Sequence, residues 1–240
     1  YIDFLESEQE YIAGEKYAKD KAFWLETFRD YRGEEITFQS NKDKINSLKV
    51  NRKSFRVPED MIPTAEEYKT NNRLSNFPLF MAALSIYFNR FLNHDDMVIG
   101  MPVHNRSKKI FRDMVGMFVS TIPLRITFDD TWTFNECTAY IKKQLWESLK
   151  HQGYPFNHLT KDLLDLKIDA GTLLNVQLIE LPGGNEAEIE KRAFYSTRYN
   201  ISQLSIYLNQ QNSPALDELD VAVDYHEDIF TEREGASLFH

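Results

Sequence analysis

The segment from Leu79 to Leu92 is apolar on nearly every side, and this feature constrains the fold of the chain more than any other. A helix without a polar face must be buried between other elements, so the chain has to fold in layers around it. Asn76 can cap this helix, and Pro78 suits its first turn. The longest apolar run, Phe77 to Phe88, has about 12 residues against the roughly 20 that cross a bilayer. We therefore predict a core helix and no membrane span.

Segments with strand character alternate with helical ones along the rest of the chain. Met97 to Val103 is a short apolar run between polar turns and predicts a buried strand. Apolar residues recur every three or four positions on one face of a helix predicted over 133–150: Phe134, Cys137, Ile141, Leu145 and Leu149. Further strands are expected over 48–57, 117–126, 173–181, 193–199, 201–209 and 219–225, and further helices over 7–31, over 60–72 and from 231.

This order of elements predicts an α/β fold with a mixed β-sheet and helices packed on it. Ser7-Glu-Gln-Glu10 has the form of a capping box for the first helical segment, and Gly183-Gly184 is expected to form a hairpin turn. No internal repeat and no linker rich in Gly, Ser or Pro divides the 240 residues. We therefore expect one structural unit.

Charge and motif content exclude several classes of function. Lys and Arg number 28 and Asp and Glu number 37, which gives a net charge of −9, so binding to nucleic acid or to an anionic membrane is not expected. The six histidines lack the short spacings of metal sites, and no metal site is expected. The motifs G-x-G-x-x-G, G-x-x-x-x-G-K and G-x-S-x-G are absent. The single cysteine, Cys137, is expected to be a core residue in a reducing compartment, the cytoplasm.

Tyr1-Ile-Asp-Phe4 begins the chain with the pattern Y-x-D-F, although Leu5-Glu-Ser7 departs from the usual ending of that motif. This segment and several others along the chain resemble motifs of the C-terminal half of nonribosomal peptide synthetase condensation domains, relatives of chloramphenicol acetyltransferase. Pro102-Val-His-Asn-Arg106 is similar to the strand-end N-R turn of the family. Val115-Gly-Met-Phe-Val-Ser-Thr-Ile-Pro-Leu-Arg125 is similar to G-x-F-V-N-T...R, with Ser120 in place of Asn.

Two segments extend this resemblance through the second half of the chain. His151-Gln-Gly-Tyr-Pro-Phe-Asn157 is similar to H-Q-D-Y-P-F-E and departs from it at Gly153 and Asn157. Asp224-Tyr-His-Glu-Asp-Ile-Phe230 is similar to the terminal strand and turn. The resemblance implies that residues 1–240 form the C-terminal lobe of a two-lobed domain, a chloramphenicol-acetyltransferase-like lobe, with Tyr1 near the crossover between the lobes.

The catalytic motif of the family, H-H-x-x-x-D-G, lies in its N-terminal half and does not occur in this sequence. The resemblance therefore implies an acyltransferase that forms amide bonds between carrier-bound acyl and aminoacyl thioesters, but no catalytic residue in this chain. We expect the isolated chain to be inactive and to supply the acceptor-side tunnel and a carrier-docking surface. The implied partners are the N-terminal lobe, peptidyl carrier domains and an adjacent adenylation domain. No cofactor is expected to bind directly, because the substrates arrive on the phosphopantetheine of carrier proteins.

Other functions remain open at this point. The chain could be a lobe of an epimerisation, ester-forming or cyclising relative, or a non-catalytic module that binds carrier proteins. The residues that separate these alternatives lie mostly in the N-terminal half of the family.

The resemblance also assigns expected roles to individual residues. Arg106 is expected to brace the active site by an ion pair with the Asp of the absent motif. Ser120 and Thr121 either line the channel for the phosphopantetheine arm or simply suit a strand. His104 either contacts substrate or is a solvated loop residue. His151 is expected to form hydrogen bonds and pack. The motif scaffold comprises Tyr1, Asp3, Phe4, Gly116, Phe118, Arg125, His151, Tyr154, Pro155 and Phe156, with Tyr1-Ile-Asp-Phe4 as a strand that connects the lobes and Gly116 serving backbone geometry or close approach.

Overall fold

The structure is a computed structural model of the chain and describes residues 1–32, 36, 48–106, 108–181, 198–210 and 214–230. Its centre is one six-stranded sheet in the order β1-β6-β5-β4-β2-β3. The strands are β1 (Val50–Arg56), β2 (Asp96–Val103), β3 (Ser120–Thr127), β4 (Val176–Leu181), β5 (Leu204–Gln210) and β6 (Leu219–His226). β4 runs parallel to both β2 and β5, and the other neighbours are antiparallel, so the predicted mixed sheet is confirmed.

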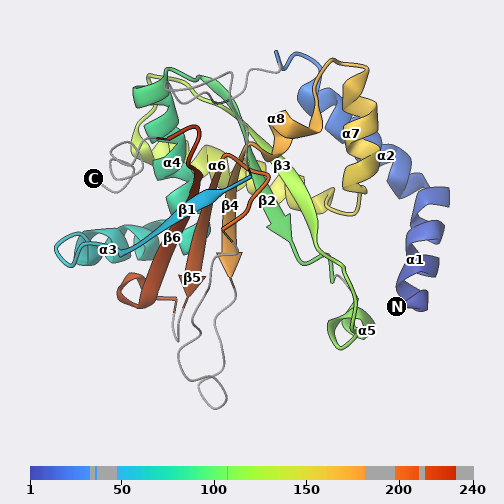
Figure 1. Cartoon of the computed structure of the whole chain (residues 1–240), viewed down its shortest axis with the longest axis horizontal. Helices are drawn as coiled ribbons and strands as arrows, with labels where there is room; N and C mark the ends of the chain where they lie inside the picture. Colours follow the sequence, from blue (N-terminus) through green and yellow to red (C-terminus); the bar gives the residue numbers. More distant parts are fainter. Residues whose placement is uncertain (33–35, 37–47, 107, 182–197, 211–213, 231–240) are drawn as a thin grey trace.

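Eight α-helices and a short 3-10 helix surround this sheet in the described part of the chain: α1 (Ile2–Ala13), α2 (Glu15–Phe28), α3 (Ile62–Asn72), α4 (Asn76–Leu92), α5 (Lys109–Arg112), α6 (Phe134–Lys150), α7 (Phe156–Leu164), α8 (Ala170–Leu174) and η1 (Leu216–Glu218). α4 packs on α6, and α6 packs on β3. Figure 1 shows α1, α2 and α7 together at the side of the molecule where β2 and β3 form the sheet edge. None of the described helices is long and apolar enough to cross a membrane.

The central helix α4 is buried as its sequence predicts. Met81, Ala82 and Phe88 have no exposed surface and belong to one core cluster with residues of α6 and the central strands. Phe91 is the departure, because 71% of its surface is exposed at the last turn. Ser75 is the N-cap of this helix, one residue before the expected Asn76.

Helix α6 also forms over the predicted range and lays its apolar face on the sheet. Thr133 begins it with a capping box, in which the Thr133 side chain and Glu136 each satisfy a main-chain N–H of the other residue. Cys137 is buried in the core, as expected, and burial raises the pKa of its thiol to about 11. The thiol is therefore held in its neutral form at physiological pH.

The beginning of the chain differs from its prediction. Tyr1-Ile-Asp-Phe4 is not a strand, because α1 starts at Ile2 and the main-chain N–H groups of Phe4 and Leu5 both donate to the carbonyl oxygen of Tyr1. Ser7-Glu-Gln-Glu10 consequently lies inside α1 and is not a cap. The helical region predicted over 7–31 is broken at Gly14, whose extended backbone separates α1 from α2.

Three strands begin later than predicted, and one of them, β5, starts at Leu204 instead of residue 201. Residues 170–174 form α8, because the Asp169 side chain accepts a hydrogen bond from the N–H of Thr172 and caps a helical turn, so β4 starts only at Val176. β3 starts at Ser120, and residues 117–119 lie outside the sheet. The strand predicted over 193–199 lies mostly outside the described residues, and the Gly183-Gly184 turn and the helix from 231 lie wholly outside them.

Candidate functional site

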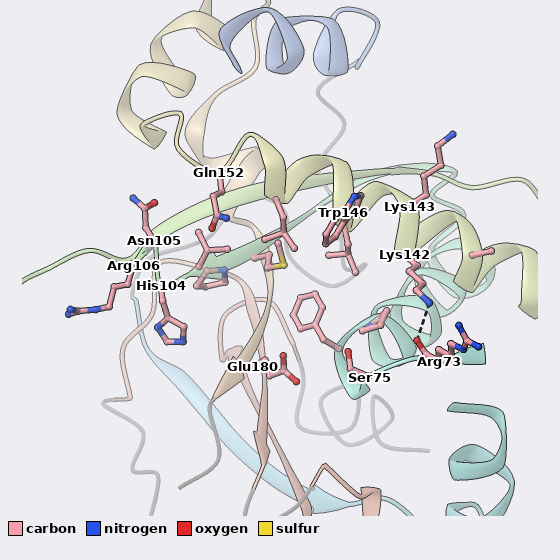
Figure 2. Close-up of a pocket in the computed structure, with 18 residues that line it drawn as sticks. Arg73, Ser75, His104, Asn105, Arg106, Lys142, Lys143, Trp146, Gln152 and Glu180 are labelled. Carbon is pink, nitrogen blue, oxygen red and sulfur yellow. Dashed lines mark hydrogen bonds between the residues drawn. The ribbon is translucent and has the colours of Figure 1, made fainter. Parts of the chain in front are cut away.

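A cavity of about 900 Å³ opens where β2 ends and α4 begins, with α6 as its third wall. Its wall is largely apolar and carries polar groups at several points of the rim (Figure 2). The lining residues are Arg73, Ser75, Phe77, Pro78, Met101, Pro102, Val103, His104, Asn105, Arg106, Ala139, Lys142, Lys143, Leu145, Trp146, Leu149, Gln152 and Glu180. An apolar pocket with a few polar groups at the carboxyl ends of parallel strands is the usual location of a ligand site in such folds.

The turn after β2 supplies one end of this cavity. Asn105 has a left-handed backbone with φ of 50°, which Asn adopts more readily than most residues, and it turns the chain away from the sheet. His104 is exposed before this turn, and Arg106 is half-buried after it. The structure thus brings the two residues to the same cavity, and their roles stay predictions.

Arg106 binds main-chain carbonyl groups within its own loop. Its guanidinium donates to the carbonyl oxygens of Phe111 and Met114, the latter at 2.8 Å, and lies 3.9 Å from the ring centroid of Phe118. None of the ion pairs among the described residues includes Arg106. Its contacts hold residues 111–116 beside the strand-end turn.

Four aromatic rings join this loop to the start of α1. The Phe118 ring lies 4.6 Å from Phe4 and 5.5 Å from Tyr1, and the Phe4 ring lies 5.4 Å from Phe111. The Tyr1 hydroxyl donates to the carbonyl of Met117 at 3.0 Å. Two of the resemblance motifs therefore meet in one aromatic cluster that contains Tyr1, Phe4 and Phe118. Asp3 is exposed in the first turn of α1.

Gly116 is required by the close approach of Tyr1. A Cβ atom at this position would lie 2.3 Å from Cδ2 of Tyr1, and the φ of 157° is one that residues with side chains rarely adopt. The residue therefore allows the Tyr1 ring to approach the loop.

We expect Gly116→Ala to lower the free energy of unfolding by about 1–2 kcal/mol, because either the Tyr1 ring or the loop must shift. Urea denaturation measures this loss. The double variant Tyr1→Ala/Gly116→Ala should recover the steric part, since it removes the ring that the new methyl group meets. Fully additive losses in the two single variants would contradict this explanation.

Ser120 and Thr121 are the first two residues of β3 and pair with Val103 and Pro102 of β2. Both side chains are half-buried, and neither lines the cavity beside the strand-end turn. They therefore pair across the sheet with Val103 and Pro102, two residues that do line it. Their channel role stays a prediction.

His151 forms hydrogen bonds and packs, as predicted. Its Nδ1 lies 2.7 Å from Oδ1 of the fully buried Asp20, and its ring stacks on Phe23 at 3.9 Å. Tyr11 donates to the other carboxylate oxygen of Asp20 at 2.7 Å, and burial together with this carboxylate raises the pKa of the Tyr11 hydroxyl above its usual range. The contact fastens α1 and α2 to the end of α6.

The remaining residues of this motif start α7. Tyr154 is buried and donates to Asp162, while Pro155 is the N-cap and Phe156 the first residue of the helix. Lys21 of α2 donates to the same Asp162 carboxylate at 2.7 Å. These residues lie outside the cavity, and their scaffold role stays a prediction.

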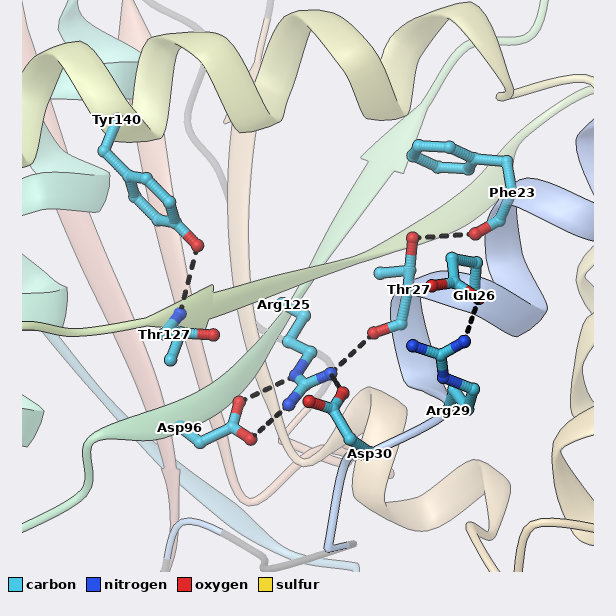
Figure 3. Close-up of polar contacts among 9 residues, drawn as sticks. All are labelled: Phe23, Glu26, Thr27, Arg29, Asp30, Asp96, Arg125, Thr127 and Tyr140. Carbon is cyan, nitrogen blue, oxygen red and sulfur yellow. Dashed lines mark hydrogen bonds and ion pairs between the residues drawn. The ribbon is translucent and has the colours of Figure 1, made fainter.

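Arg125 connects the sheet to α2 rather than to the cavity (Figure 3). Its guanidinium donates to both carboxylate oxygens of Asp96 at 2.8 and 2.6 Å, to Asp30 at 2.6 Å and to the carbonyl of Thr27 at 2.7 Å. Hydrogen bonds from Arg125 hold the pKa of Asp30 below its usual value, and both carboxylates raise the pKa of Arg125. These contacts are those of a residue that joins α2 to the sheet.

Several cavity residues were not anticipated from the sequence. Trp146 is 65% exposed on α6, and Lys142 and Lys143 lie one turn before it. Glu180 reaches the cavity from β4. The signal for Trp146 was a large aromatic residue outside the apolar face of an amphipathic helix, and the signal for Glu180 was a carboxylate in an otherwise apolar strand.

The described residues contain no group of three or more His, Cys, Asp or Glu side chains arranged to hold a metal ion. The cavity therefore offers Lys, Arg, His and Glu side chains and apolar surface as its chemistry. Such a lining can bind an amphipathic substrate with charged groups at defined positions.

Comparison with known proteins identifies the family. The family model described as the condensation domain matches residues 1–238. Surfactin synthase subunit 1 of Bacillus subtilis (strain 168) is 31% identical over 238 residues, which are 98% of this chain and 6% of that protein. Tyrocidine synthase 3 of Brevibacillus parabrevis is 23% identical over 224 residues, 90% of this chain and 3% of that protein. The chain thus spans less than a tenth of either relative.

Solved structures share the fold. The first condensation domain of the calcium-dependent antibiotic synthetase, in complex with substrate analogue 3a, superimposes with a TM-score of 0.74 at 17% identity and covers 98% of this chain and 51% of that one. The condensation domain from the Monacolin K polyketide synthase MokA gives a TM-score of 0.80 at 15% identity, over 100% of this chain and 58% of that one. The chain therefore has the chloramphenicol-acetyltransferase-like fold of about half of each such domain, and it belongs to the condensation-domain family.

Proposed function

We propose that the chain is the C-terminal lobe of a condensation domain that forms amide bonds in a nonribosomal peptide synthetase. The observation that carries this proposal is the condensation-domain match over residues 1–238, in a chain that covers 51–58% of the solved domains. The order of the motifs from Tyr1-Ile-Asp-Phe4 to Asp224-Tyr-His-Glu-Asp-Ile-Phe230 favours the C-terminal half.

Exposed apolar side chains in the segment 110–119, which follows Arg106, support the proposal that a second lobe covers this surface. Val115 is 95% exposed and Met117 79%, and both flank Gly116, where the loop meets Tyr1. Ile110 and Val119 of the same segment are also exposed. A cluster of this kind is typical of a surface that another part of the protein covers.

The proposed reaction is acyl transfer to an amine. The amine nitrogen of a carrier-bound aminoacyl thioester attacks the carbonyl carbon of an upstream acyl or peptidyl thioester, a C–N bond forms and the C–S bond breaks. The thiol leaves on the upstream carrier arm, and the amine loses one proton. In this proposal a histidine of the other lobe accepts or positions that proton, because His151 lies outside the cavity, bonded to Asp20 and stacked on Phe23.

In this proposal the cavity beside the strand-end turn receives the acceptor, and Arg106, His104, Ser120 and Thr121 lie toward the active site. Peptidyl carrier domains deliver both substrates on phosphopantetheine, and an adenylation domain of the same synthetase loads the acceptor. No cofactor is bound directly, and the reaction takes place in the cytoplasm.

The test is a product analysis of the complete domain that contains this chain. It is given a donor and an acceptor, each loaded on a carrier protein, with the acceptor either an aminoacyl thioester or its hydroxyacyl counterpart. We expect mass spectrometry to detect the amide and no comparable amount of ester. Efficient ester formation, or inversion of the acceptor stereocentre without elongation, would support one of the relatives and contradict the proposal.

A further inference from the structure

Glu180 is an unusual residue for its place in the sheet. Val176 and Leu178 lie four and two positions before it on β4 and are fully or almost fully buried, so the alternation of the strand turns all three toward the same face. An apolar residue would continue this row. Instead the row ends in a carboxylate that lines the cavity (Figure 2).

The register of the sheet places Glu180 beside the strand-end turn. Gly100 of β2 pairs with Gln177 of the parallel strand β4, and Glu180 lies three residues beyond Gln177 just as Val103 lies three beyond Gly100. His104 follows Val103 directly. Glu180 is therefore at the carboxyl ends of neighbouring parallel strands, on the wall of the same cavity as His104 and Arg106.

The carboxylate has no cationic partner in the part of the chain that the structure describes. No hydrogen bond or ion pair to Glu180 forms there, and loss of solvent alone raises its pKa above the usual value. Arg73, Lys142 and Lys143 line another part of the cavity, and Lys142 donates instead to the carbonyl of Arg73 at 3.0 Å. Glu180 is exposed to the open cavity, where its carboxylate can accept hydrogen bonds from a cationic donor, and such charge-assisted bonds offset its partial loss of solvent.

The proposed reaction brings such a donor into the cavity. We propose that Glu180 binds a primary ammonium group of the acceptor amino acid and thereby selects the amine-bearing substrate; this inference rests on the proposed function. The ammonium donates hydrogen bonds to the carboxylate, while Arg73, Lys142 and Lys143 repel it from the other part of the cavity. The group is either the α-ammonium of any acceptor or the side-chain ammonium of a basic one.

Binding of non-reactive acceptor analogues tests this inference. The complete domain is titrated with the pantetheine amides of leucine, of its 2-hydroxy counterpart, of lysine and of norleucine, and the dissociation constants are measured by calorimetry. We expect Glu180→Gln to weaken binding of the leucine amide by about tenfold or more, from the loss of a charge-assisted hydrogen bond, and to leave the hydroxy analogue unchanged. If instead only the lysine amide loses affinity relative to norleucine, the side-chain ammonium is the ligand.

Glu67→Gln is the matched control, because it removes one negative charge from an exposed position of α3 that does not line the cavity. It should change none of the four constants. The inference is overturned if Glu180→Gln also leaves all four unchanged. The binding measurement needs no turnover, so the two hypotheses can fail separately. If the domain forms the amide but Glu180→Gln leaves the four dissociation constants unchanged, only the Glu180 role is refuted. If Glu180→Gln weakens binding of the ammonium-bearing analogues but the domain forms no amide, only the proposed function is refuted.

Discussion

Replacing Arg125 by Met should lower the free energy of unfolding by about 3 kcal/mol, because the change leaves the Asp96 carboxylate without its bidentate partner. The Arg125 side chain is only 11% exposed and that of Asp96 25%. The carbonyl of Thr27 also loses its donor, so the link between α2 and the sheet weakens. Asp30 contributes little to the loss, since 80% of its side chain is exposed and solvent screens the pair.

Arg56→Met is the matched control for this change. Arg56 also pairs with an aspartate across neighbouring strands, at 2.9 Å from Asp220, but its side chain is 71% exposed. We expect a loss of about 1 kcal/mol or less. Urea denaturation of both variants measures the difference. Equal losses for Arg125 and Arg56 would contradict the structural role assigned to Arg125.

Replacing Arg106 by Leu should reduce the rate of amide formation by the complete domain by about a hundredfold or more, with a smaller change in KM. The guanidinium holds the carbonyl groups of Phe111 and Met114 and covers the ring of Phe118. Its loss releases a loop at the cavity, and misplacement of reacting groups by about 1 Å can cost about a hundredfold in rate. The expected ion pair with the aspartate of the other lobe would be lost as well.

Arg106→Lys separates a positioning role from a merely structural one. Lysine keeps the positive charge but cannot reproduce the planar set of donors. We expect the Lys variant to recover part of kcat if the charge braces the other lobe, while its thermal unfolding matches that of the Leu variant. A rate within a factor of about three of wild type for Arg106→Leu would contradict the positioning role.

The elements predicted best from the sequence are those whose stabilising features, such as apolar spacing and capping residues, lie within a few turns of the same segment. The helix over 133–150 carries both its apolar spacing and the Thr133–Glu136 capping box in the sequence, and α4 is apolar throughout. Tyr1-Ile-Asp-Phe4 was assigned to a strand and is helical, because its rings find their partners at Phe111 and Phe118, more than a hundred residues away. Such contacts leave no local trace in the sequence.

The candidate site was predicted in the same uneven way. His104 and Arg106 were found because they follow a strand whose apolar run marks its end. Glu180 and Trp146 were missed because their importance depends on the register of β4 against β2 and on the direction in which α6 crosses the cavity. The sequence predicts a scaffold role for His151 and Arg125, but their partners Asp20 and Asp96 could not be named without the fold.

The central claim is that this chain supplies one lobe and that the proton-accepting histidine lies in the other. The most direct measurement compares the rate of amide formation from carrier-loaded donor and acceptor for the 240 residues alone and for the complete two-lobed domain. The account predicts amide formation by the complete domain and a rate at the uncatalysed background for the chain alone. Comparable rates for the two proteins would contradict it, since the catalytic base would then have to lie within these 240 residues.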